Sequence, residues 1–477
     1  MPFELRGGAA EPVFARIART IGDDIRRGRL RPGARLPGSR RLAESLGAHR
    51  NTVLRALAEL QAEGWLETAP GRGTFVSARI PAERPRRASE LRVPRDPGRV
   101  GFALPRASRE GPPPSSAPLP MGGGTPDVRL VPTAELARAL RRALRDTSLL
   151  DYGDARGDVA LREALARHVA RTRGVAADAD DVLVTRGSQM ALDLLARSVL
   201  SPGDVVAVEA WGYRAAWAAL RASGVQLVPV AVDRHGLSLE HLDRVLASHA
   251  VRALYLTPHH QYPTTVTLSA PRRLGLLERA RRHRFAILED DYDHEFHYDG
   301  RPVLPLASAD DAGVVIHFGT LSKILAPGLR VGYVVAPRPV LERMTRARVF
   351  VDRQGDLVLE RALAELFEDG EVTRHAHRMR RVYHARRDAM ATELRAAFGD
   401  ALDVRVPSGG MALWVRTESA VDVASWAARA LERGVFFQPG QRFAFDGRAQ
   451  PFLRLGFAAL DDLERQRGIA ILRETWR

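Results

Sequence analysis

Residues 318–333 read FGTLSKILAPGLRVGY and contain Lys323, the only lysine among the 477 residues of the chain. The other 71 of the 72 basic residues are arginine. Arginine cannot replace lysine in forming a Schiff base, because that reaction needs an amine that can lose its proton near neutral pH. The alternative is that an arginine-rich composition left one lysine by chance. The hydroxyl residues before Lys323 and the Gly-x-Arg-x-Gly pattern after it favour the chemical role.

The same stretch closely resembles the cofactor-lysine segment of fold-type I aminotransferases, which bind pyridoxal 5'-phosphate (PLP). The resemblance implies that Lys323 carries the cofactor as an internal aldimine. Around it, Thr320, Ser322 and Arg330 are expected to complete the phosphate site, with Arg330 binding in a bidentate manner.

From about residue 121 onward, apolar strands alternate with helices, which predicts an α/β domain with a mostly parallel sheet covered on both faces. Ligands of such sheets bind just beyond the carboxyl ends of the strands. The expected strands are residues 182–185, 205–208, 253–257, 285–289, 314–318 and 331–336.

Two of these strand ends offer groups for a phosphorylated ring cofactor. Gly187 is followed by Ser188 and Gln189 at the start of a predicted helix, whose free backbone amides and dipole suit a phosphate. Such a turn is common in α/β proteins and is weak evidence alone. Tyr213 follows the strand 205–208 and is a candidate to stack on the pyridine ring, with core packing as the alternative.

A third strand end carries an acidic cluster, Glu289-Asp290-Asp291-Tyr292-Asp293. A carboxylate that faces the pyridine nitrogen keeps it protonated, and a phenol can bond the 3-oxygen of the ring. We assign Asp290 to the nitrogen and Tyr292 to the oxygen. A solvated acidic loop is the alternative, but the cluster directly follows a strand of buried type.

The first eighty residues predict a small α+β domain. Helices are expected over residues 13–27, from Ser39 (as N-cap) to Leu46, and over 50–63, followed by a hairpin of strands 65–68 and 73–76. Two helices joined by a short turn with glycine form a helix-turn-helix, whose second helix enters the major groove of DNA. The spacing alone also fits a generic helical hairpin.

Three motifs make this part resemble the winged helix of GntR-type repressors: Leu36–Ala43, Arg50–Val53 and Gly71–Val76. In that family the start of the second helix, the recognition helix and the wing tip contact DNA. The resemblance assigns DNA binding to Arg40, Arg50, Asn51, Thr52, Arg55 and Arg72. His49 stands where a small hydroxyl residue is usual.

Together the two resemblances identify the chain as a member of the MocR subfamily of GntR-type regulators. The implied organisation is a winged helix-turn-helix over residues 11–77, a linker over 78–120 that is rich in Pro and Arg, and an aminotransferase-like domain over 121–477 with a small C-terminal α+β subdomain. The family further implies a homodimer, a double-stranded DNA operator and an amine or amino-acid effector. It also implies that Tyr152 reaches the phosphate of the neighbouring subunit and that Arg454 holds the effector carboxylate.

Two departures bear on catalysis. Tyr262 stands where catalytic aminotransferases carry an asparagine for the ring oxygen, and Thr265 replaces a glycine. Both favour a regulator that senses an amino acid, an amine or PLP itself through Lys323. A working aminotransferase that carries a DNA-binding module is the alternative, and partial transamination remains open.

Composition adds broader expectations. The net charge of +15 favours a polyanionic partner, although a solvated basic surface would also explain it. The absence of cysteine excludes disulfides and thiolate metal sites and fits a cytoplasmic protein. No apolar run is long enough for a membrane span. We expect no metal at His259-His260 or His294/His297, since these residues lack acid or thiolate company. The first pair is expected to line the cofactor pocket.

Overall fold

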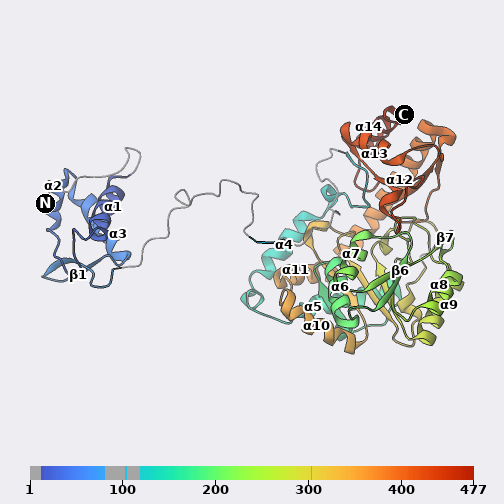
Figure 1. The fold of residues 1–477 in the computed structure, drawn as a ribbon, viewed down its shortest axis with the longest axis horizontal. Helices are drawn as coiled ribbons and strands as arrows, with labels where there is room; N and C mark the ends of the chain where they lie inside the picture. The colour runs from blue at the N-terminus through green and yellow to red at the C-terminus, as the bar shows by residue number, and fades with distance from the viewer. Residues whose placement is uncertain (1–11, 81–101, 105–118, 302, 477) are drawn as a thin grey trace. The chain divides into compact units, whose positions relative to one another are not determined.

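The computed structural model describes residues 12–80, 102–104, 119–301 and 303–476. They divide into two compact units, residues 1–111 and 112–477, and each unit is described by itself (Figure 1). Most of the predicted linker over residues 78–120 lies outside the described residues.

The first unit is the predicted three-helix fold with a hairpin. It contains α1 (Val13–Arg26), α2 (Ser39–Leu46) and α3 (Arg50–Ala62), followed by the antiparallel strands β1 (Leu66–Ala69) and β2 (Gly73–Val76). Apolar residues spaced three or four apart along α1 and α3 form its core, because that spacing places them on one helix face. The fully buried members include Ile17, Ile21, Val53, Ala56 and Leu42.

The turn between α2 and α3 shows how this sequence builds a helix-turn-helix. Gly47 ends α2 in the left-handed conformation, with φ of 59°. The Nδ1 atom of His49 accepts a hydrogen bond from the backbone N–H of Asn51 at 3.3 Å, so His49 acts as the N-cap of α3. The predicted N-cap role of Ser39 is wrong: α2 begins at Ser39 itself, and its N-cap Gly38 has no side chain to accept a hydrogen bond.

The second unit contains a seven-stranded sheet with the strand order β4-β12-β11-β10-β9-β5-β6. Only β12 runs antiparallel to its neighbours among these strands, which confirms the mostly parallel sheet. Residues 226–230, which form β6, were not predicted as a strand. The strands are β4 (Val182–Thr185), β5 (Val205–Glu209), β6 (Gln226–Val230), β9 (Val251–Leu256), β10 (Ala286–Asp291), β11 (Val315–Thr320) and β12 (Gly332–Val335).

Helices cover both faces of this sheet (Figure 1). Val206 and Val208 pack against one group of helices, while Ala207 between them packs against another, because successive strand residues point to opposite faces. The first group is α6 (Ser188–Val199), α7 (Arg214–Ala222) and α10 (Arg338–Val351). The opposite face holds α8 (Leu239–Ser248) and α9 (Ala270–His283), with α4 (Thr133–Ala143), α5 (Val159–Arg173) and α11 (Leu357–Glu368) around β4 and β12.

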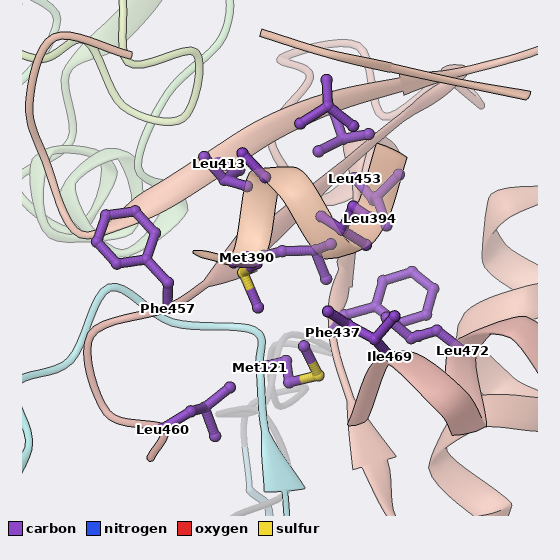
Figure 2. Packing of buried hydrophobic residues seen from close by; sticks show 14 of the residues in the cluster. Met121, Met390, Leu394, Leu413, Phe437, Leu453, Phe457, Leu460, Ile469 and Leu472 are labelled. Carbon is purple, nitrogen blue, oxygen red and sulfur yellow. The ribbon is translucent and has the colours of Figure 1, made fainter. Parts of the chain in front are cut away.

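A smaller α+β subdomain ends the chain. Its antiparallel sheet has the order β13-β14-β17-β16, and its longest helix is α12 (Glu371–Phe398). Figure 2 shows Met390, Leu394, Leu413 and Leu453 gathered in its core. Met121, from the N-terminal part of the unit's sequence, lies in the same core. The remaining elements are β13 (Leu402–Val404), β14 (Ala412–Thr417), α13 (Val423–Glu432), β16 (Gln438–Pro439), β17 (Phe452–Gly456) and α14 (Asp462–Glu474).

Two short strand pairings complete the described part of the unit. β3 (Leu119–Pro120) pairs in parallel with β15 (Val435–Phe436), so two residues that the sequence analysis placed in the linker belong to the C-terminal subdomain. β7 (Val232–Asp233) pairs with β8 (Gly236–Leu237). The first pairing draws residues 121–125 toward β17, where Gly456 donates a backbone hydrogen bond to Met121.

Candidate functional site

The predicted site residues meet at one edge of the seven-stranded sheet. Strands β4, β5, β9, β10 and β11 are parallel, so their carboxyl ends lie together, and the antiparallel β12 begins at the same edge. A cavity of about 250 Å³ opens there. It is lined by Gly123, Gly124, Thr125, Ser188, Gln189, Tyr213, Tyr255, Thr257, Tyr262, Asp290, Tyr292, Thr320, Ser322, Lys323, Pro327, Arg330 and Arg454.

Lys323 follows β11 and reaches into this cavity. Its Nζ donates a hydrogen bond to the carbonyl of Gly124 at 2.8 Å. Burial lowers the pKa of Lys323 to about 8, and the nearby Arg454 guanidinium acts in the same direction, against the opposing effect of Asp293 and Asp290. The neutral, nucleophilic amine is therefore far more abundant near neutral pH than for an ordinary lysine.

Asp290, near the end of β10, has one carboxylate oxygen held and one unpaired. Its Oδ2 accepts a hydrogen bond from the Tyr255 hydroxyl at 2.9 Å. Its Oδ1 is buried without a partner among the described residues. Burial raises the pKa of Asp290 to about 7, against the opposing effect of the Tyr255 hydroxyl. A cationic N–H in the cavity would supply the missing partner and favour the charged carboxylate.

Three tyrosines form the aromatic wall of the cavity. The Tyr213 and Tyr262 rings meet edge to face, with centroids 5.4 Å apart, and Tyr292 lies beyond Tyr262 at 6.2 Å. The Tyr292 hydroxyl donates a hydrogen bond to the carbonyl of His260 at 2.8 Å, so it is oriented by the loop after β9. Thr265, at the place of the expected glycine, has a left-handed φ of 64°.

Other lining residues of the cavity suit an anion. Helix α6 begins at Ser188, and its N-cap Gly187 has no side chain that could bond the first amides. The Ser322 hydroxyl is buried without a partner among the described residues. Arg330 lines the same cavity, and its Nη2 donates to the carbonyl of Arg186 at 2.9 Å. A Cβ at Gly187 would lie 3.0 Å from the Arg330 guanidinium, and the φ of 81° also favours glycine.

Thr320 and Gln189 are engaged mainly with the protein. The Thr320 hydroxyl accepts a hydrogen bond from the Ser322 backbone N–H at 3.1 Å and thereby shapes the turn before Lys323. The Gln189 side chain donates to the carbonyl of Ala215 at 2.9 Å. Both line the cavity, but these bonds favour a positioning role.

Arg454 lies on β17 and brings a buried cation from the C-terminal subdomain. It is 2% exposed, and neither Nε nor Nη1 has a hydrogen-bond partner among the described residues. Its guanidinium lies over the Tyr262 ring, 4.5 Å from the centroid. A buried guanidinium with unpaired donors is costly, because desolvation is not offset by hydrogen bonds. The arrangement therefore offers a binding point for a carboxylate.

The donor set fits PLP. The cavity contains one half-buried amine, at Lys323, and a carboxylate oxygen of Asp290 that has no partner among the described residues and could accept from a ring nitrogen. It also contains an anion-binding site beside Ser322 and Arg330. These match the aldehyde, the pyridine nitrogen and the phosphate of that cofactor.

Tyr152 does not line the cavity of its own chain; it is 72% exposed, with the Arg353 guanidinium 3.9 Å from the centroid of its ring. Its expected contact with the phosphate of a neighbouring subunit stays a prediction. His259 and His260 do not line the cavity either. The sequence analysis missed Tyr255 and Gly124. A tyrosine inside an apolar strand was the only signal for Tyr255, and nothing in the sequence marked Gly124.

The predicted DNA-contacting residues gather on the first unit. Arg40 at the start of α2, Arg50 and Asn51 at the start of α3, and Arg72 at the hairpin tip are all exposed. Arg50 lies near the first turn of α2, since its Nε donates to the Ser39 hydroxyl at 3.4 Å. Arg55 is also exposed, but its guanidinium lies 4.0 Å from the centroid of the Phe14 ring. Thr52 is half-buried.

Two protein families match the chain. Bacterial regulatory proteins of the gntR family match residues 14–76, and aminotransferases of class I and II match residues 120–472.

No helix in the described part of the chain is long and apolar enough to cross a membrane.

Two curated regulators are similar over nearly the whole chain. The probable rhizopine catabolism regulatory protein MocR of Rhizobium meliloti is 33% identical, covering 98% of this chain and 94% of its own length. The HTH-type transcriptional regulator TauR of Rhodobacter capsulatus is 34% identical, covering 98% and 97%.

Solved structures resemble the second unit. The multiple substrate aminotransferase of Thermococcus profundus has a TM-score of 0.70 and 30% identity, over 76% of this chain and 92% of that protein. The alpha-aminoadipate aminotransferase LysN of Thermus thermophilus, solved with N-(5'-phosphopyridoxyl)-L-leucine, also has a TM-score of 0.70, with 31% identity over 75% and 92%. The class I and II aminotransferase fold implies a PLP cofactor.

Proposed function

The chain belongs to the MocR-type transcriptional regulators of the GntR family, and from this membership we propose that its DNA affinity responds to a small amine with one carboxylate, bound beside PLP at Lys323. The GntR domain implies DNA binding, and the aminotransferase-like domain implies the cofactor. The observation that carries the proposal is the shared cavity of Lys323, the unpaired Asp290 oxygen and the unpaired Arg454 guanidinium.

When bound, PLP supplies an aldehyde with which primary amines condense. The residues of the chain hold and orient the reactants. Tyr255 holds Oδ2 of the Asp290 carboxylate and leaves Oδ1 available to the cofactor, and Ser322 and Arg330 supply donors for the phosphate. Lys323 keeps a neutral fraction near neutral pH because its pKa is lowered to about 8.

The charges around the cavity limit how many charged groups an effector can carry. Lys323, Arg330 and Arg454 are the cations among the lining residues, and Asp290 is the acid. If Lys323 and Arg330 serve the cofactor, Arg454 alone remains for an effector carboxylate. Neither a second carboxylate nor a second ammonium would find a partner, so each would be desolvated at a cost. A dicarboxylic amino acid or a diamine should therefore bind less well than an amine with one carboxylate.

Effector binding can change DNA affinity only if it favours one state of the protein over another. The test measures the affinity of the full-length, PLP-loaded protein for a duplex selected by that protein from a random library, by fluorescence anisotropy. Adding an amine with one carboxylate should change the dissociation constant for DNA. A second measurement, in which PLP is added to the apo protein without an amine, tests whether the cofactor itself is the signal. Multiple turnovers of amino acid and 2-oxoacid at ordinary enzyme rates, without any change in DNA affinity, would favour the aminotransferase alternative.

We also propose that the chain forms a homodimer through an apolar patch beside Tyr152. Phe350 is 91% exposed, and Leu150 and Tyr152 are 64% and 72% exposed. The end of α10 and the segment around Gly153 lie together, because the Gln354 side chain accepts a hydrogen bond from Gly153 N at 2.6 Å. Large apolar side chains exposed on neighbouring segments are typical of an interaction surface. Sedimentation equilibrium should give twice the 52.5 kDa chain mass, and Phe350→Glu should shift it toward one chain.

Replacing Arg50 or Arg72 by alanine should weaken DNA binding by about tenfold each, since removing an interaction with a base or a phosphate costs about 1–3 kcal/mol. The log–log slope of affinity against salt should fall by about one for each phosphate that the protein no longer neutralises. Arg244→Ala removes an exposed arginine of α8 and is the control for net charge. Equally weakened binding in Arg50→Ala and Arg244→Ala would contradict a role for α3 in DNA recognition.

A further inference from the structure

Three buried histidines lie together close to the cofactor cavity: His259, His260 and His297, here called the three-histidine cluster. Each offers one ring nitrogen, and the three nitrogens lie within 4.8 Å of one another. The side chains come from two segments, since His259 and His260 follow β9 while His297 follows the short helical turn His294–Phe296 after β10. All three are at most 6% exposed.

His260 is oriented as a metal-binding histidine usually is. Its Nδ1 lies 2.8 Å from the Asp293 carboxylate, which favours the tautomer that carries its proton on Nδ1 and leaves a lone pair on Nε2. That Nε2 lies 3.4 Å from Nδ1 of His297. A carboxylate that accepts the outer N–H of a ligand histidine is the common second layer of zinc sites. The sequence analysis expected no metal here because it assumed that no acidic side chain accompanies these histidines. The structure places the Asp293 carboxylate beside His260.

His259 provides an independent observation. Both of its ring nitrogens are buried without a hydrogen-bond partner among the described residues. A buried polar group without a partner costs about 1–3 kcal/mol, so such groups usually have a water or an ion beside them. Oδ2 of Asp293 is likewise buried without a hydrogen-bond partner in the described part of the chain. The cluster thus combines unsatisfied donors and acceptors with the spacing of a coordination site.

We propose that the three-histidine cluster binds one divalent transition-metal ion of the zinc type, with His259, His260 and His297 as ligands and Asp293 supporting His260. Zinc–nitrogen bonds of about 2.0–2.1 Å in a tetrahedral site place ligand nitrogens about 3.4 Å apart. The His260–His297 pair already has this separation, and the His259 nitrogen lies within 4.8 Å of both, so binding would draw it closer. Imidazole ligands favour zinc, copper or nickel over calcium and magnesium, which require oxygen.

The position of the cluster gives the ion a structural role. The His260 carbonyl orients the Tyr292 hydroxyl, and Tyr262 follows two residues later, so the loop after β9 contributes to the cavity wall. His297 also forms a β-bridge with Gly409 of the C-terminal subdomain. An ion held by the cluster would link the loop after β9 to the segment after β10 and keep this wall in place beside β14 and β17.

The test uses full-length protein without a histidine tag, because a tag would itself bind metal. The protein is dialysed against a chelator and then titrated with Zn²⁺ in competition with a chromophoric chelator, and bound zinc is measured by elemental analysis. We expect one tightly bound Zn²⁺ per chain and a higher unfolding temperature with the ion than without it. Wild-type protein that retains no zinc after removal of free metal would overturn the proposal.

Two variants locate the site. His259→Gln and His297→Gln should each lower bound zinc to near zero and remove the zinc-dependent rise in unfolding temperature. His283→Gln, an exposed histidine at the end of α9, is the matched control and should bind as the wild type does. Unchanged zinc binding in folded His259→Gln and His297→Gln would place the metal elsewhere and contradict the assignment. Because the readout is metal content, it does not depend on PLP or on DNA binding.

Discussion

Replacing Lys323 by alanine is expected to abolish covalent attachment of PLP, because the sequence contains no other side-chain amine. Wild-type protein incubated with PLP and reduced with borohydride should gain one cofactor mass per chain. Peptide mapping should place that mass on the segment that contains residue 323. The alanine variant should carry no label within the aminotransferase-like domain.

The pH dependence of attachment follows from the lowered pKa of Lys323. Burial and Arg454 move that pKa down to about 8, so about one amine in ten is neutral at pH 7. Only the neutral amine attacks an aldehyde, so the initial rate of attachment should rise between pH 6 and pH 9 and level off above the pKa. A rate that keeps rising tenfold per pH unit up to pH 10 would indicate an ordinary lysine.

Two further variants separate chemistry from charge. Lys323→Arg keeps the cation but cannot condense with an aldehyde, so it should match the alanine variant in labelling. Arg454→Met leaves the amine in place and should retain the label. A stoichiometric label on folded Lys323→Ala, or a wild-type label found only at the N-terminal amine, would refute the role of Lys323.

The parts of the site that the sequence analysis predicted carry a local signal. Asp290 and Tyr292 follow an apolar strand directly, and Lys323 is the only lysine beside a distinctive glycine pattern. Parallel strands place their carboxyl ends at one edge, so residues 185–190, 209–213, 290–292 and 320–323 could be expected to meet without knowledge of the strand order. Residues from all four of these segments line one cavity, with Tyr213 alone representing the second segment.

The missed residues depend on pairings that the sequence does not reveal. Tyr255 reaches Asp290 because β9 lies beside β10 with Tyr255 opposite Leu288, and a shift of one residue would turn the phenol to the other face. Gly124 meets Lys323 across 199 residues of chain, after β3 has joined the C-terminal subdomain. Arg454 was named from family resemblance alone; the cavity places it beside Lys323, but its contact with an effector remains a prediction.

Replacing Arg454 by methionine is expected to weaken the binding of an amine with one carboxylate by about 30-fold or more. Removing one partner of a buried charge pair costs about 2–5 kcal/mol, and 1.4 kcal/mol corresponds to a factor of ten. β-Alanine is a suitable probe, because ethylamine is the same molecule without the carboxylate. Binding to PLP-loaded protein is followed by the change in visible absorbance of the cofactor.

The matched pair of ligands distinguishes recognition from general damage to the pocket. If Arg454 binds the carboxylate, the substitution should weaken β-alanine strongly and leave ethylamine nearly unchanged. Arg454→Lys should recover part of the affinity, since it keeps the charge but loses the bidentate geometry. Equal weakening of both ligands would mean that Arg454 only supports the Tyr262 ring, over which its guanidinium lies at 4.5 Å.

A third ligand tests the restriction to one charge. Aspartate is β-alanine with a second carboxylate, and the cavity lining offers no further cation once Lys323 and Arg330 serve the cofactor. Wild-type protein should therefore bind β-alanine more tightly than aspartate, by an amount that reflects the desolvation of an unpaired carboxylate. Methionine at position 454 should weaken both ligands and leave this preference nearly unchanged, because both ligands would then lack a partner for the carboxylate that Arg454 holds. Tighter binding of aspartate by the wild type would require a second cation beyond those that line the cavity, and would contradict the restriction to one carboxylate.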